Sequence, residues 1–100
     1  MNKLQAKSLK MFISQIKNGQ YSNLKMTHNA KTEKLSIEVA RFCDDIDAGD
    51  NAVKLQRATE RAQELLDLLP PATCDGFIYK KEITRRRYQG FLNSVCVVVE

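Results

Sequence analysis

Several features on which many enzymes and membrane proteins rely are scarce or absent in this chain of 100 residues. It has no tryptophan, four Phe and three Tyr, so we expect a core built mainly from aliphatic side chains. Its four glycines are isolated from one another, which excludes a Gly-rich loop of the kind that cradles phosphate groups. The longest apolar stretch, Val95–Val99, is far too short to span a bilayer.

Histidine is represented once, by His28, and the three cysteines Cys43, Cys74 and Cys96 are widely spaced. A Cys-His nucleophile pair needs both side chains together with a third group that orients the base, and nothing in the sequence points to such an arrangement. A structural zinc site usually takes its ligands in close pairs, whereas no two of these four residues are closer than 15 positions. We therefore expect no catalytic residue, no bound metal and no cofactor, and we predict that the protein is not an enzyme.

The odd number and the long spacing of the cysteines also indicate a compartment. Small secreted proteins usually carry their cysteines in disulfide pairs, whereas free thiols suit a reducing cytosol. No charged segment followed by an apolar run opens the chain, so we expect no signal peptide. We predict a cytoplasmic protein without a membrane partner, in which Cys43 and Cys96 belong to the core because they lie in apolar runs.

The net charge of +4 is distributed unevenly along the chain. Seven lysines and one acid lie in residues 3–34, five acids and one arginine in residues 38–50, and five bases and one acid in residues 80–87. Such asymmetry favours an acidic partner, which is either a nucleic acid or an acidic protein surface. A lysine face that contacts only solvent is the alternative.

The first segment has the period of an amphipathic helix. Apolar residues at positions 9, 12, 13 and 16 share one face, which predicts a helix over residues 2–18 that ends at a Gly C-cap. Lys3, Lys7 and Lys10 follow the same period on the opposite face. Leu4 and Met11 lie seven residues apart on a third strip, where they either flank the core or face a partner.

A helix capped by Asp50 is predicted over residues 51–69. Pro70 and Pro71 end it, because proline lacks an N–H group and clashes with the preceding helical turn. A residue before a proline is pushed out of the helical region, so Leu69 and Pro70 should both be extended. The apolar stripe of this helix is Leu55, Ala58, Ala62, Leu65, Leu66 and Leu69.

The segment between these two helices allows two interpretations. Apolar residues from Leu35 to Ile46 recur at i, i+4, i+7, i+8 and i+11, which favours a helix that begins after Thr32. Apolar and polar residues also alternate on both sides of the polar turn 29–32, so a hairpin over residues 24–39 stays open.

The last quarter is mixed. A short extended piece is one interpretation of residues 77–79. The spacing of apolar residues between Tyr88 and Val95 favours a helix that begins near Ile83, and the tail 97–99 either frays or pairs. The sequence thus predicts one domain of residues 1–100 that is all-α or mostly α, with three to four helices. The helix-stop junction at Pro70-Pro71 lies between the last two predicted helices, and a basic C-terminal segment follows it.

The basic run beside Tyr88 is one candidate binding surface. Arg85, Arg86 and Arg87 supply charges for phosphate contacts, whose strength would depend on salt. On a helix three consecutive arginines point in three directions, so they do not form the recognition stripe of a helix-turn-helix. The guanidinium fork also binds carboxylates bidentately, so we expect an acidic protein surface first and a nucleic acid second.

The Leu69-Pro70-Pro71 junction is the other candidate. Its simplest interpretation is a helix stop, but short extended segments with proline also dock in the grooves of partner proteins. Because X-Pro bonds are substrates of prolyl isomerases, an isomerase acting at Leu69-Pro70 is a further candidate partner. The residues that we predict to bind partners are Lys3, Lys7, Lys10, Leu69, Pro70, Pro71, Lys80, Lys81, Arg85, Arg86, Arg87 and Tyr88.

The chain is small, opens with the Lys-rich segment Met1 to Lys17 and contains the Leu69-Pro70-Pro71 junction. In these features it resembles small accessory proteins from the early operons of temperate phages, among them the anti-RecBCD proteins of the P22-like phages. The resemblance implies a protein of the host cytoplasm that binds the host RecBCD recombination nuclease, a nuclease and helicase complex, and modifies it. We therefore expect a non-catalytic protein that binds and modulates a host protein. A small basic DNA- or RNA-binding regulator and a structural or assembly subunit are the alternatives.

Overall fold

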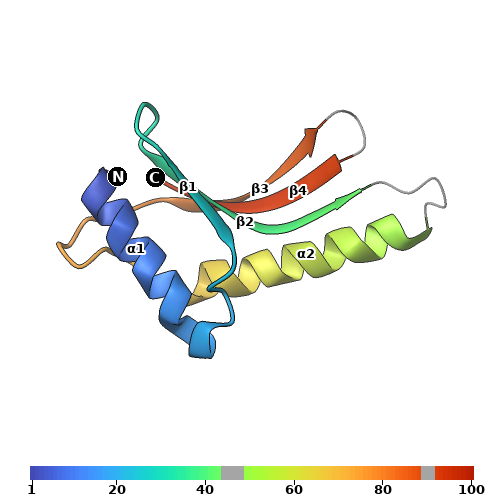
Figure 1. Ribbon diagram of the computed structural model, residues 1–100, viewed down its shortest axis with the longest axis horizontal. Helices are drawn as coiled ribbons and strands as arrows, with labels where there is room; N and C mark the ends of the chain where they lie inside the picture. The colour runs from blue at the N-terminus through green and yellow to red at the C-terminus, as the bar shows by residue number, and fades with distance from the viewer. Residues whose placement is uncertain (44–48, 89–91) are drawn as a thin grey trace.

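An antiparallel sheet of four strands dominates the computed structural model, which describes residues 1–43, 49–88 and 92–100. Two helices pack against one face of this sheet, and no element of the described chain covers the other face (Figure 1). The strand order is β1-β2-β4-β3. In chain order the elements are α1 (Lys3–Gln15), the 3-10 turn η1 (Ile16–Gly19), β1 (Lys25–Asn29), β2 (Lys34–Cys43), α2 (Gly49–Leu68), β3 (Lys81–Tyr88) and β4 (Leu92–Val99).

The prediction of an all-α or mostly α domain is therefore wrong, although both flanking helices are confirmed. α1 begins with a capping box, in which Asn2 Oδ1 accepts from the Gln5 amide and Gln5 Oε1 accepts from the Asn2 amide, each at 2.8 Å. Helical geometry is lost three residues earlier than predicted, because Lys17, Asn18 and Gly19 adopt left-handed φ angles of 52°, 55° and 80°.

The helix predicted over residues 51–69 is α2. It starts at Gly49, so Asp50 lies inside its first turn and is not the cap. It ends at Leu68, one residue before the two prolines, because the residue that precedes a proline is pushed out of the helical region. The Lys81 ammonium donates to the carbonyl oxygens of Leu66 at 2.9 Å and Leu69 at 3.5 Å, so a cation lies at the negative end of this helix.

The segment 34–43 is strand β2 rather than the helix favoured by its spacing. β1 pairs with it in the hairpin that was the alternative interpretation, with Asn29 opposite Lys34. The helix-like spacing arises from a β-bulge between Glu38 and Ala40. An extra residue there shifts the phase of the strand, so Phe42 returns to the face of Leu35 at an odd spacing that a regular strand forbids. Ile46, the last member of the pattern, lies outside the described residues.

The helix predicted from Ile83 is wrong as well. Residues 81–88 form edge strand β3, which pairs along its whole length with β4. β4 is the central strand beside β2, and its residues 94–99 are all buried, which suits a β-branched run flanked by a strand on each side. The tail 97–99, for which fraying or pairing was open, is paired. Phe91, part of the misleading spacing, lies outside the described residues.

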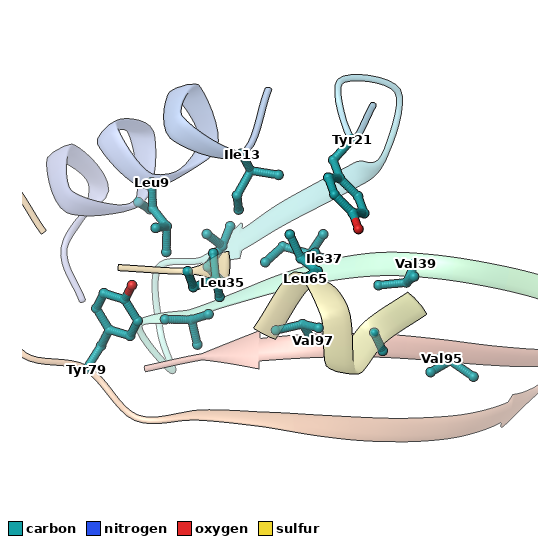
Figure 2. Close-up of a cluster of buried hydrophobic side chains, with 14 of the residues drawn as sticks. Leu9, Ile13, Tyr21, Leu35, Ile37, Val39, Leu65, Tyr79, Val95 and Val97 are labelled. Carbon is teal, nitrogen blue, oxygen red and sulfur yellow. The ribbon is translucent and has the colours of Figure 1, made fainter. Parts of the chain in front are cut away.

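The core lies between the sheet and the two helices (Figure 2). Alternate residues of the two central strands point toward the helices, and the bulk is aliphatic, as the composition predicted. The prediction for the cysteines is half right, since Cys96 is buried and Cys43 is exposed. The main contributors are Leu9, Ile13, Tyr21, Leu35, Ile37, Val39, Ala58, Ala62, Leu65, Tyr79, Val95, Val97 and Val99.

Candidate functional site

The outer side of α1 carries apolar side chains that do not reach the core. Leu4 is 78% exposed and Met11 is 55% exposed, so this strip faces away from the core rather than flanking it. Phe12, which the helical period places with the core, lies at its edge with 37% of its surface exposed. Large apolar side chains gathered in one place are uncommon on the surface of a monomer and mark sites of interaction.

The Pro-Pro junction leads into a tight turn that lies against this side of α1. The Tyr79 hydroxyl donates to the Pro70 carbonyl and fixes the start of the turn. The Thr73 amide donates to the Phe77 carbonyl, and the Gly76 amide donates to the Thr73 carbonyl, both at 2.9 Å. Gly76 suits this turn because its φ of 84° lies in the left-handed region, which glycine adopts without a steric cost. The segment is thus held by its own hydrogen bonds.

Two further contacts attach the turn to α1. Gln5 Nε2 donates to Asp75 Oδ2 at 3.0 Å, and Ser8 Oγ lies 2.9 Å from Cys74 Sγ. Hydrogen bonds from Thr73, from Gln5 and from the Phe77 backbone hold the pKa of Asp75 below its usual value. The carboxylate therefore stays ionised as an anchor of the turn at neutral pH.

An open hollow of about 640 Å³ lies between α1 and this turn, and we call it the α1 groove. Apolar side chains make up much of its wall, and Lys7 contributes the one cation among its lining residues. Such a groove accepts an apolar segment of a partner, because burial of apolar surface drives the association. Its lining residues are Leu4, Lys7, Ser8, Leu9, Met11, Phe12, Gln15, Pro70, Ala72, Thr73 and Cys74.

The α1 groove brings together two of the predicted features. Lys7 and Pro70 line it, and Lys3 and Lys10 lie one turn away from Lys7 on the same helix. Pro71 is exposed, whereas Leu69 is 4% exposed and packs in the core, so the junction is anchored at its first residue. Every peptide bond among the described residues is trans.

The basic run of β3 is arranged differently from the prediction. In a strand its side chains alternate between two faces, so Arg86 lies on the uncovered face of the sheet and Arg85 and Arg87 lie on the other. Lys80 is exposed, whereas Lys81 is half-buried against the end of α2. The Tyr88 side chain lies outside the part of the structure that is described.

Sequence reasoning missed Ser8 and Cys74, which join the turn to α1 across 66 positions of sequence. The strip of Leu4 and Met11 was the signal that pointed to this surface. His28 Nε2 donates to the Met1 carbonyl at 3.1 Å, away from every cysteine contact that the structure describes. Within residues 1–43, 49–88 and 92–100, no three His, Cys, Asp or Glu side chains gather as metal ligands.

In the described chain, neither helix combines the length and apolar character that crossing a membrane requires. Comparisons with protein families, with curated proteins and with solved structures found no match to this chain.

Proposed function

We propose that the protein acts without catalysis, by binding a host protein in the α1 groove and modulating it. The observation that carries the proposal is the exposure of Leu4, Met11 and Phe12 beside an open apolar hollow. Burying one such side chain fully contributes about 1.5–3 kcal/mol to association, so a few of them form the centre of an interface.

The occupant that fits best is an apolar segment of the partner that carries acidic residues. Lys7 lies in the lining, and Lys3 and Lys10 extend the positive charge along α1. Acidic residues on the partner would pair with these cations at the rim and accelerate encounter. Asp75, at the far end of the turn, is already engaged by Gln5 and so opposes such a partner only weakly.

The resemblance to the anti-RecBCD proteins makes the host RecBCD nuclease the first partner to test. In this proposal the protein binds that complex and changes its activity, which protects phage DNA ends. Because the turn is held to α1 by side-chain contacts, the α1 groove exists before binding, and little conformational entropy is lost on association.

The test is the affinity of the full chain for purified RecBCD, measured by biolayer interferometry. Leu4→Ser combined with Met11→Ser should raise Kd about tenfold or more, since each 1.4 kcal/mol of lost binding energy is a factor of ten. Val53→Ser is the matched control, because Val53 is 46% exposed and lies on α2 rather than in the α1 groove. An unchanged Kd in the double variant, or an equal loss in the control, contradicts the proposal.

A crosslinking experiment locates the contact independently of affinity. Cys74 lines the α1 groove and is exposed, so a photoreactive maleimide attached there should crosslink to RecBCD on irradiation. The chain for this experiment carries Cys43→Ser, which removes the other exposed thiol. Labelling Cys43 in a Cys74→Ser chain should give little product. Equal crosslinking from both positions would place the partner elsewhere.

A further inference from the structure

The face of the sheet away from the helices is hollowed, and its character differs from that of the α1 groove. The central strands β2 and β4 dip in the middle and rise toward both ends, so the sheet is concave on the side away from α2 (Figure 1). A hollow of about 410 Å³ lies in this concavity and draws its lining from all four strands. It is lined by Lys25, Thr27, Asn29, Thr32, Lys34, Ser36, Glu38, Arg41, Arg86, Cys96 and Val98.

The hollow has a floor of small side chains and a rim of long cationic ones. Cys96 and Val98 of β4 form the centre of the floor and are only 3% and 7% exposed, so a ligand would contact mainly the polar and cationic side chains around them. Lys25 rises from β1, Lys34 and Arg41 from the two ends of β2, and Arg86 from β3. The positive charges therefore surround the floor instead of forming one cluster.

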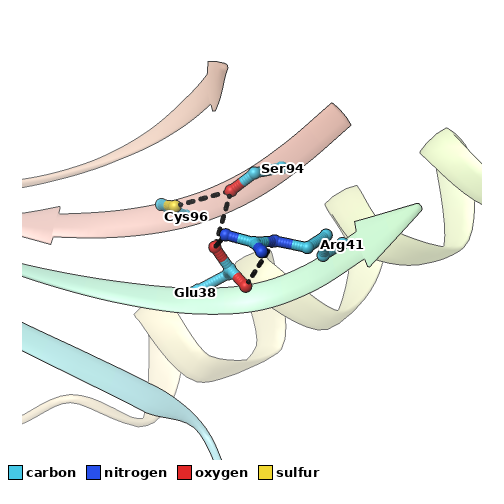
Figure 3. A network of polar contacts seen from close by, with 4 residues as sticks. All are labelled: Glu38, Arg41, Ser94 and Cys96. Atoms are coloured by element: carbon cyan, nitrogen blue, oxygen red, sulfur yellow. Dashed lines mark hydrogen bonds and ion pairs between the residues drawn. The ribbon is translucent and has the colours of Figure 1, made fainter. Parts of the chain in front are cut away.

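Glu38 is the one carboxylate among the lining residues, and its charge is engaged within the sheet (Figure 3). Arg41 binds it through Nε at 3.2 Å and Nη2 at 3.3 Å, and Ser94 Oγ donates to it at 3.2 Å. Lys34 pairs with Glu100 at 3.4 Å. Within the described chain, Lys25 and Arg86 form no ion pair, so they are the cations most ready to receive an anion.

A nucleic acid fits this face better than a protein does. The centre of a protein interface is apolar and depleted in charge, yet the large exposed apolar side chains of the described chain lie outside the lining of this hollow. Apart from Glu38, its polar groups are the lysine, arginine, threonine, serine and asparagine side chains that proteins use to contact phosphates and sugars. The lining includes no aromatic side chain on which unpaired bases could stack, which disfavours a single strand.

The spacing of the cations matches a B-form duplex. Lys25 and Arg86 stand on the two edge strands, and strand spacing, rise and register place their Cα atoms roughly 16 Å apart. A major groove about 12 Å wide separates the phosphates of B-DNA by a similar span, whereas that of A-form RNA is deep and narrow. We propose that the concave face binds the backbone of duplex DNA without reading its sequence. This inference is independent of the proposed function, because the α1 groove shares no lining residue with this hollow.

The test is fluorescence anisotropy of a labelled 30-base-pair DNA of random sequence with the full chain at 50 and 200 mM KCl. If Lys25 and Arg86 each contact a phosphate, affinity should fall about 12-fold over this fourfold rise in salt. Lys25→Gln with Arg86→Gln removes both contacts, so it should weaken binding at 50 mM and leave little dependence on salt. Lys25→Arg with Arg86→Lys keeps both charges and should retain binding.

Lys7→Gln with Lys10→Gln is the matched control, since it removes the same charge from α1 and should leave the salt effect unchanged. Circular dichroism confirms that each variant folds. The inference is overturned if the wild type does not bind duplex DNA at 50 mM, if both double variants lose affinity equally, or if single-stranded DNA or duplex RNA of the same sequence binds more tightly. None of these results bears on RecBCD binding in the α1 groove.

Discussion

Lys81 should stabilise the fold, and its neighbour Lys80 should not. The Lys81 ammonium donates to the Leu66 carbonyl at 2.9 Å and more weakly to the Leu69 carbonyl, at the C-terminal end of α2. Hydrogen bonds from charged groups contribute about 1.5–3 kcal/mol, and a cation at a helix C-terminus adds about 0.3–1 kcal/mol. Lys81→Met keeps the aliphatic stem but removes these interactions, so we expect a loss at the lower end, about 1.5 kcal/mol.

The measurement is urea unfolding at pH 7, followed by far-UV circular dichroism. Lys81→Met should lower the midpoint without changing the slope m, and it should lower Tm by about 6–12 °C for a domain of this size. Lys80→Met is the control, because Lys80 is exposed and should change stability by less than about 0.5 kcal/mol. If both substitutions cost the same, or if Lys81→Met costs less than about 0.5 kcal/mol, Lys81 does not stabilise α2.

Three other predictions test the framework of the α1 groove and the core. Tyr79→Phe removes the hydroxyl that donates to Pro70 and should cost about 1 kcal/mol. Burial raises the pKa of Tyr79 above its ordinary value of 10, so the stability that the neutral hydroxyl contributes is complete below pH 10 and is lost as the pH rises above it. The difference in unfolding free energy between the wild type and the variant should therefore narrow in alkaline unfolding curves. Asn2→Ala breaks the capping box and should cost about 1 kcal/mol in thermal unfolding, whereas Asn23→Ala at an exposed position should change little. Leu65→Ala opens a cavity at a fully buried position and should cost about 2–5 kcal/mol in urea unfolding.

The two helices were predictable because their signals are local. The capping residue of α1 and the prolines after α2 lie within a few positions of the ends that they define. The sheet was not predictable in the same way, because the residues of β2 pair with residues of β4 that lie 49 to 64 positions later in the chain. The bulge at Glu38 then gave a strand the apolar spacing of a helix.

The candidate site was predictable in its parts but not as a whole. Met11 and Pro70 were singled out separately, one as a strip on a helix and the other as a junction. Their union in the α1 groove depends on the contact of Ser8 with Cys74, which no local pattern encodes. Arg86 was singled out among the residues that line the concave face, but the face itself was missed, since its lining residues lie together only when the strands are in register.

The bulge in β2 also sets how the chain tolerates changes in length. One extra residue between Glu38 and Ala40 decides that Arg41 faces the uncovered side and Phe42 the helices. A deletion of one residue there would exchange these two faces for the rest of the strand, and would turn a guanidinium toward the core and a phenyl ring toward water. We therefore expect the chain to accept insertions and deletions in its turns rather than in β2, whereas substitutions on the concave face should leave the packing against α2 intact.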